Sequence, residues 1–292
     1  MSGGFSLLVQ TLEKLQYAGK EGKCMKMKDE NKNYEELTFT DDFMFCKVLE
    51  NNLEICKELL EMILGVKIRK IVCTSKQKVI EITSDGKGIR LDVYLEDDDS
   101  TVYDIEMQTT EQRDISKRSR YYQGMIDLNL IERGARYGDL KKSYVIFICL
   151  HDPFKKGLHL YYFANTCKGH PELQLEDEAY KVFVSAEGDA DDVSDNMKAF
   201  LKYLCGETVD NRLVKEIDVQ VQKAREQVEW REEYMTLLMR DQEKKEEGAK
   251  LHAIEMAKIM LSQNEPIEKI SMYTQLPEEE IISIQKEEDN NE

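Results

Sequence analysis

The fold is decided by residues 90–108, which have the sequence RLDVYLEDDDSTVYDIEMQ. Apolar and polar side chains alternate on both sides of the turn-forming run at 97–100, a pattern typical of two antiparallel strands. The alternation places Asp92 on the polar face of one strand, and Asp104, Glu106 and Gln108 on that of the other. Neighbouring carboxylates repel each other unless a cation lies between them, and a hard divalent cation with oxygen ligands is the usual one. The hairpin therefore predicts a metal site that includes Asp92 and Glu106.

The segments around this hairpin predict an α/β sandwich, in which a sheet is flanked by helices. Strands are expected at 79–83, 89–95, 101–109, 144–150, 158–163 and 180–184, the first three forming an antiparallel meander. The run at 144–150 is apolar throughout, as in a central strand that is covered on both faces. Between the hairpin and this run, apolar residues at helical spacing predict a helix over 113–132.

Helices are expected at both ends of the chain. Thr40 or Asp41 can cap the first of them, and the next covers 53–64 and ends at Gly65. After Asp195 all segments look helical, including a long charged helix over 213–246 that Gly248 ends. These patterns predict four parts: a flexible arm over 1–34 with a short helix around 7–15, a core over 35–206, a long charged helix over 207–247, and a small helical appendix with an acidic tail over 248–292.

The charge balance bears on the possible substrates. Lys and Arg number 41 and Asp and Glu 58, for a formal net charge of −17, which disfavours nucleic acid because that affinity needs cations that neutralise phosphates. Two local clusters oppose this balance. Five basic and no acidic residues lie between Lys67 and Lys78, and four more basic residues follow the hairpin between Arg113 and Arg120. Both clusters are expected to form a basic rim near the carboxylates.

The cysteines and the apolar runs exclude other classes of protein. The seven cysteines are scattered without a CxxC pair, so neither a disulfide framework nor a zinc site is expected. No apolar run approaches the roughly 20 residues that span a bilayer, and the N-terminus has no secretory signal. We therefore expect a cytoplasmic protein without membrane contact and without a small-molecule organic cofactor.

The order of the motifs resembles a known nuclease family. Arg90-Leu91-Asp92-Val93, followed by Tyr103-Asp104-Ile105-Glu106-Met107-Gln108, resembles the D…(D/E)xK signature of the PD-(D/E)XK nucleases. More narrowly, the chain resembles the Rpn family of recombination-promoting nucleases, also described as PD-(D/E)XK family transposases. The similarity extends in order over about residues 35–285, through the segments Phe39–Phe45, Arg118–Tyr122, Gly134–Tyr137 and 144–150.

This resemblance implies a restriction-endonuclease-like (PD-(D/E)XK) mixed sheet flanked by helices, with an all-helical C-terminal extension. It also implies a bacterial DNA endonuclease that depends on Mg²⁺ or Mn²⁺ and is linked to recombination or transposition. Asp92 and Glu106 would be the metal ligands, and Gln108 stands where the superfamily usually has Lys, so that a neutral amide replaces a cation. Weaker candidates that would support the carboxylates or contact substrate are Asp42, Arg118 and Tyr122.

Two other functions stay open. Gln108 and the negative net charge also suit a catalytically degenerate nuclease fold that binds nucleic acid or a protein without cutting. Alternatively, the helical region over 213–285 could act by self-association. Within it, residues 267–282 resemble a small helix-turn-helix, but the second helix begins with three glutamates. Because base reading needs cationic or amide side chains, a homo-oligomer through these helices is the preferred expectation.

Overall fold

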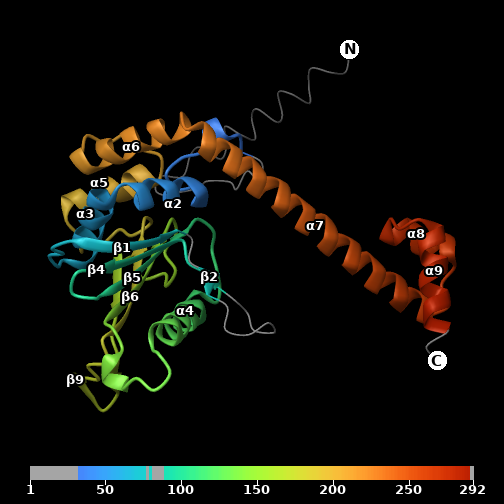
Figure 1. Cartoon of the computed structure of the whole chain (residues 1–292), viewed down its shortest axis with the longest axis horizontal. Coiled ribbons are helices and arrows are strands. Elements are labelled where there is room, and N and C mark those ends of the chain that lie inside the picture. Colours follow the sequence, from blue (N-terminus) through green and yellow to red (C-terminus); the bar gives the residue numbers. More distant parts are fainter. Residues whose placement is uncertain (1–31, 77–78, 81–88, 290–292) are drawn as a thin grey trace. The chain divides into compact units, whose positions relative to one another are not determined.

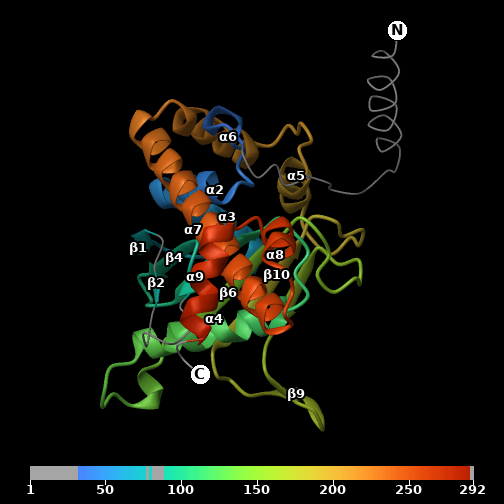
Figure 2. The ribbon, with the colours of Figure 1, turned by 90° about the vertical axis from the view of Figure 1, so that its right-hand side faces the viewer.

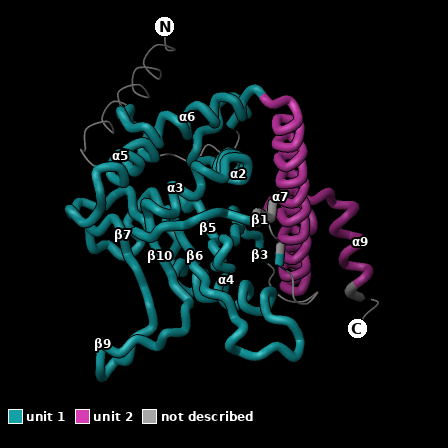
Figure 3. The backbone as a smooth tube through the Cα atoms, turned by 60° about the vertical axis from the view of Figure 1, so that its left-hand side comes forward, with its two compact units in different colours: residues 1–226 teal, residues 227–292 magenta. Residues whose placement is uncertain are grey.

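The computed structural model describes residues 32–76, 79–80 and 89–289 (Figure 1). The helix expected around 7–15 lies outside the described residues. The chain divides into two compact units, the first ending at Glu226 and the second beginning at Gln227 (Figure 3). None of the described helices is both long and apolar enough to cross a lipid bilayer.

The first unit is built on a six-stranded sheet with the order β1-β4-β5-β6-β10-β7. Its strands are β1 (Ile71–Lys76), β4 (Val93–Asp97), β5 (Val102–Gln108), β6 (Ser143–Cys149), β7 (Leu160–Phe163) and β10 (Ala179–Ser185). The central strand β6 pairs in parallel with β5 and β10, and the other three pairs are antiparallel. Every residue of β6 is buried, as its continuous apolar run predicts. The predicted fold class, a mixed sheet flanked by helices, is confirmed.

Helices cover both faces of this sheet (Figures 1 and 2). One face carries α2 (Asp42–Asn51), α3 (Leu53–Leu64), α5 (Asp195–Leu204) and α6 (Arg212–Arg225), and the other face carries α4 (Ile115–Leu130). Gly65 ends α3 with φ 66°, a left-handed conformation that glycine adopts without strain, so the predicted stop is confirmed. Under α4, Phe147 of β6 stacks on Phe183 of β10 with ring centroids 5.5 Å apart. This apolar layer surrounds the polar groups of the hairpin.

The predicted meander is confirmed only in part, and residues 81–83 of its first strand lie outside the described residues. The sheet neighbour of β4 is β1, whose second half is polar and therefore lacks the apolar alternation that marks a strand. Residues 79–80 instead form β2 (Val79–Ile80), which pairs with β3 (Ile89–Arg90) in a separate two-stranded sheet. The strand expected over 89–95 is also divided, because the backbone bends at Asp92 between β3 and β4.

One hairpin has no counterpart in the expected strands. It consists of β8 (Thr166–Cys167) and β9 (His170–Gln174), and it projects from the sheet between β7 and β10 (Figure 2). All residues of both strands are exposed, so no buried face imposes an apolar period on their sequence.

The second unit consists of α7 (Val228–Ser262), α8 (Ile267–Thr274) and α9 (Glu278–Asp289). Its small core contains Ala257, Ile270, Leu276, Ile281 and Ile284. The single helix expected over 213–246 is wrong, since α6 ends at Arg225 and α7 begins at Val228. Gly248 does not end a helix and lies inside α7, because a single glycine lowers helix propensity without preventing the helix. α8 and α9 lie within the expected helical appendix over 248–292, whose first residues belong to α7.

Candidate active site

Asp92 lies at the bend before β4 and faces β5. Val93 pairs with Ile105 in the register, so the next position of β5, Glu106, is opposite Asp92. The backbone N–H of Asp92 donates to Oε1 of Glu106 at 3.0 Å, and the backbone N–H of Met107 donates to Oδ2 of Asp92 at 3.2 Å. Each carboxylate thus accepts a hydrogen bond from the strand that carries the other. The structure brings these two candidate residues together, and the bend makes the Asp92 amide available for this contact.

Three carboxyl groups are buried at this point of the sheet. Asp104 and Glu106 are 0% exposed and Asp92 is 9% exposed. Burial and the charge of Asp42 raise the pKa of Asp92 to about 6, and burial and the charge of Asp92 raise the pKa of Glu106 to about 8. Burial and the charges of Glu106 and Asp92 hold the pKa of Asp104 well above its usual range. The site therefore concentrates carboxyl groups where water does not stabilise their charged forms.

Arg118 of α4 is the cation that binds Glu106. Its Nη2 donates to Oε2 of Glu106 at 2.6 Å, its Nη1 to Oε1 of Gln108 at 2.8 Å, and its Nε to the hydroxyl of Tyr122 at 2.9 Å. The guanidinium lies 4.9 Å from the ring centroid of Tyr122 and 5.3 Å from that of Phe147. Arg118 and Tyr122 are one turn apart on the helix and thus share a face. The structure brings Arg118, Tyr122, Glu106 and Gln108 into one hydrogen-bonded group.

Gln108 is held from both ends of its amide. Its Oε1 accepts from Arg118, and its Nε2 donates to the backbone oxygen of Thr110 at 2.8 Å. The side chain is 5% exposed, so this network fixes which end faces the arginine. A lysine at this position would place a second cation against Arg118. The glutamine is therefore matched to the arginine that lies beside it.

Asp42 lies at the start of α2, and its charge reaches the site. It is among the groups that raise the pKa of Asp92, and α2 packs against β4. The side chain of Asp42 is exposed, unlike the three carboxyl groups of the hairpin. Asp42 therefore lies at the margin of the site, near Asp92 but outside the hydrogen-bonded group around Arg118.

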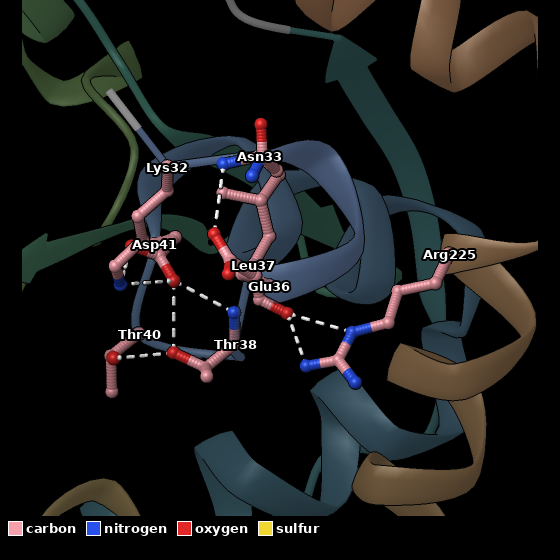
Figure 4. Close-up of polar contacts among 8 residues, drawn as sticks. All are labelled: Lys32, Asn33, Glu36, Leu37, Thr38, Thr40, Asp41 and Arg225. Carbon is pink, nitrogen blue, oxygen red and sulfur yellow. Dashed lines mark hydrogen bonds and ion pairs between the residues drawn. The ribbon is translucent and has the colours of Figure 1, made fainter. Parts of the chain in front are cut away.

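The segment before α2 is anchored on two sides (Figure 4). Asp41 accepts hydrogen bonds from the backbone N–H of Thr38 at 2.7 Å and from Nζ of Lys32 at 2.7 Å. Arg225 of α6 donates from Nε and Nη2 to the backbone oxygen of Leu37, at 2.9 and 2.6 Å. Asp41 thus stabilises the turn, and its side chain accepts no capping hydrogen bond from α2, whose start is positioned by this network.

The two predicted basic clusters lie in different places. Arg69 forms an ion pair with Asp98 in the turn after β4, at the far end of that strand from Asp92. The expectation that this part of the first cluster lies near the carboxylates is therefore wrong. β1 runs antiparallel to β4, so its first residue lies at the far end of β4, and its last residue, Lys76, pairs with Val93 beside Asp92. Lys78 lies outside the described residues. The second cluster does flank the site, since it lies on α4 and directly before it around Arg118.

Sequence reasoning placed Asp104 on the correct face but not in the site. No amide, guanidinium or hydroxyl group of the described residues donates to either of its carboxylate oxygens. Its position two residues before Glu106, on the same face of β5, was the signal that could have identified it. Phe147, which covers Arg118, carries no such signal because it belongs to an apolar run.

The donor set fits a hard divalent cation. Carboxylate oxygens are its preferred ligands, and the buried oxygens of Asp104 have, among the described residues, no polar neighbour other than the carboxyl group of Glu106 to share a proton with. Within the described ranges, no three Asp, Glu, His or Cys side chains are arranged as a complete cage. One or two carboxylates with water and substrate oxygens are the usual ligands of Mg²⁺, so Asp92 and Glu106 suffice as the protein's share. A cation at Glu106 would have to share that carboxylate with Arg118.

The fold and the site define a class of protein. A mixed sheet flanked by helices, with acidic side chains on two adjacent strands and a helix packed over them, is the architecture of a PD-(D/E)XK nuclease domain. Residues 39–177 match the family model described as PD-(D/E)XK nuclease family transposase, the family that the motifs of this segment resemble. The matched segment contains all six candidate residues, from Asp42 to Tyr122. No curated protein and no solved structure matches the chain.

Proposed function

We propose that the chain is a divalent-metal-dependent DNA endonuclease that hydrolyses phosphodiester bonds in recombination or transposition. The observation that supports this most is the buried group of Asp92, Asp104 and Glu106 on two adjacent strands. Burying several carboxylates together destabilises a fold unless cations compensate them, and the two arginines whose charges lower the pKa of Asp92, Arg90 and Arg118, face three carboxyl groups. A purely structural role therefore explains the arrangement poorly, whereas a metal-dependent site requires it.

Each residue would have a defined role. Asp92 and Glu106 would hold Mg²⁺ or Mn²⁺, which supplies a Lewis acid and activates a water molecule when bound. Arg118 would contact the phosphate, because a guanidinium matches phosphate oxygens in charge and geometry. Arg118 would also provide the positive charge that Gln108 lacks, since its Nη1 lies 2.8 Å from Oε1 of Gln108. Tyr122 would orient Arg118 through its hydroxyl.

Supercoiled plasmid DNA incubated with the full chain and Mg²⁺ or Mn²⁺ tests this proposal. We expect the intact protein to nick or linearise the plasmid, and Asp92→Asn and Glu106→Gln to lower the rate by at least about 100-fold. These replacements keep the size of each side chain, so a loss of activity reports on charge and not on packing. The matched control is Glu96→Gln on the same strand β4, whose partner is Lys141 and which should cleave at the rate of the intact chain.

The contrary outcome supports a second candidate function. The chain would then be a degenerate nuclease fold that binds DNA or a protein without cutting, as the neutral Gln108 and the ion pair of Arg118 with Glu106 allow. DNA retained in a gel-shift assay, with no cleavage under either metal, would favour this candidate. Equal cleavage by the intact chain and by Asp92→Asn would show that the activity arises elsewhere.

We further propose a homo-oligomer that forms through the second unit. Several apolar side chains of α7 are exposed, among them Met235 at 50% and Met239 at 66%. The expected result is that the full chain has a multiple of its monomer mass by light scattering, and that a chain ending at Glu226 is monomeric. Arg225 and Ala224, which bind the segment before α2, remain in this shortened chain. A monomeric full chain would contradict the proposal.

A further inference from the structure

The loop between α4 and β6, residues 131–142, presents an unusually exposed tyrosine. Tyr137, in the 3-10 helix η2 (Tyr137–Asp139), is 87% exposed, and its side chain forms no hydrogen bond or ring contact with the described residues. Burying an aromatic ring is among the larger apolar contributions to stability, so a ring left in water suggests a partner. The loop projects from the first unit beside α4 (Figure 2). A second tyrosine, Tyr121, is 41% exposed on α4 itself.

Three arginines lie close to these tyrosines in the sequence. Arg113 directly precedes α4, Arg120 is adjacent to Tyr121, and Arg133 follows the helix. All three are exposed, and none forms an ion pair or side-chain hydrogen bond within the part of the chain that the structure describes. In a chain whose acidic residues outnumber its basic ones by 58 to 41, exposed arginines without a carboxylate partner are a distinctive feature. We name Arg113, Arg120, Tyr121, Arg133 and Tyr137 the arginine–tyrosine track.

Two acidic residues near the track form ion pairs with cations that do not belong to it, so the track keeps its positive charge. Lys117 lies 3.7 Å from Asp114, and Arg136 lies 3.4 Å from Asp139, so these two carboxylates are compensated by other cations. Glu132 is the acidic neighbour of Arg133 in the sequence. Since Arg113, Arg120 and Arg133 are not needed for internal ion pairs, they are available to an anionic ligand.

We infer that the arginine–tyrosine track binds a single-stranded segment of DNA on the exposed side of α4, next to the candidate site. This inference rests on the proposed function for the identity of the ligand. Arginines neutralise phosphates of either form of DNA, but exposed aromatic rings bind by stacking on base faces. In a duplex those faces are covered by neighbouring bases. Exposed tyrosines next to arginines therefore favour a strand whose bases are unpaired.

The dimensions of α4 agree with such a binding surface. Arg118 lies in the first turn of the helix at the site, and Leu130 ends it. Twelve residues at about 1.5 Å per residue correspond to roughly 18 Å, so the track continues well beyond the carboxylates. This length suits a site for several nucleotides, which is the usual size for single-strand binding surfaces.

Fluorescence anisotropy with a labelled single-stranded oligonucleotide and with the duplex of the same sequence tests the track. Measurements on the full chain in EDTA separate binding from cleavage. We expect the single strand to bind more tightly than the duplex. Tyr137→Ala should weaken single-strand binding roughly ten-fold, since stacking on one base is worth about 1–3 kcal/mol, and Tyr137→Phe should retain it. Arg133→Glu should weaken binding and reduce its salt dependence by roughly one phosphate contact.

Tyr273→Ala is the matched control, because this tyrosine is 66% exposed on α8 in the second unit and should bind as the intact chain does. Duplex binding as tight as single-strand binding, or unchanged affinity in Tyr137→Ala, would overturn the inference. If the intact chain cleaves plasmid and Tyr137→Ala binds and cleaves equally well, only the inference fails. If the track binds a single strand as expected and neither metal supports cleavage, only the proposed nuclease activity fails.

Discussion

Replacing Arg118 by methionine is expected to destabilise the metal-free protein strongly at about pH 8. The buried carboxylate of Glu106 would lose the cation that lies 2.6 Å from it. Breaking a buried ion pair from one side costs about 3–5 kcal/mol, and because the side chain of Arg118 is 33% exposed we expect about 2–3 kcal/mol. This corresponds to a fall of roughly 6 °C in the Tm of the first unit, measured by scanning calorimetry in EDTA.

The effect should depend on pH and on the partner carboxylate. The pKa of Glu106 is raised to about 8, so at about pH 5 the folded protein holds this carboxyl protonated and needs the arginine less. The loss of Tm in Arg118→Met should therefore be smaller at pH 5 than at pH 8. In a Glu106→Gln background the same replacement should cost much less. An equal loss at both pH values and in both backgrounds would mean that Arg118 acts through its packing on Tyr122 and Phe147.

Replacing Asp104 by asparagine is expected to stabilise the metal-free protein above about pH 6. The pKa of Asp104 is raised in the folded state by burial and by Glu106 and Asp92, so the folded chain holds a proton that the unfolded chain has already released. Stability must then fall as the pH rises from the unfolded pKa, about 4, towards the folded one. Asparagine has no such proton, so its advantage in Tm should grow from pH 5 to pH 8.

Mg²⁺ provides the control for this second prediction. If the cation binds among the carboxylates, it should raise the Tm of the intact chain at pH 8 and thereby reduce the advantage of Asp104→Asn. Thermal unfolding with and without Mg²⁺ at both pH values measures both effects. An asparagine variant that is less stable than the intact chain at pH 8 would contradict the prediction, since it would show that ionised Asp104 is stabilised by the folded protein.

The parts of the fold that sequence predicts are those with strong periodicity. The continuous apolar run of β6 and the stop of α3 at Gly65 correspond to simple local rules. β1 was not predicted because its polar second half lacks the alternation of apolar and polar residues that marks a strand. β9 was not predicted because all its side chains are exposed. The break between α6 and α7 has no glycine or proline to mark it. It follows from tertiary contacts, such as those of Tyr34 with Ala224 and of Arg225 with Leu37.

The sequence predicts which residues form the candidate site, but it does not predict the hydrogen bonds that join them. Strand parity placed Glu106 and Gln108 on one face, and helical spacing placed Arg118 and Tyr122 on another. That Arg118 joins both groups depends on how α4 packs on the sheet, which no local pattern specifies. The burial of Asp104 depends on the same packing, because α4 covers the polar face that the alternation alone would leave in water.

The hydrogen bonds of the site join residues that are close in the sequence. Asp92 and Glu106 are 14 residues apart, and Glu106 and Arg118 are 12 apart. Closing such short loops takes little chain entropy, so this hairpin and helix can assemble early in folding. The ring of Phe147 can pack on Arg118 only after β6 pairs with β5, and β6 follows α4 in the chain. During synthesis on a ribosome, the carboxylates and their arginine would therefore emerge together, before the strand that shields them from water.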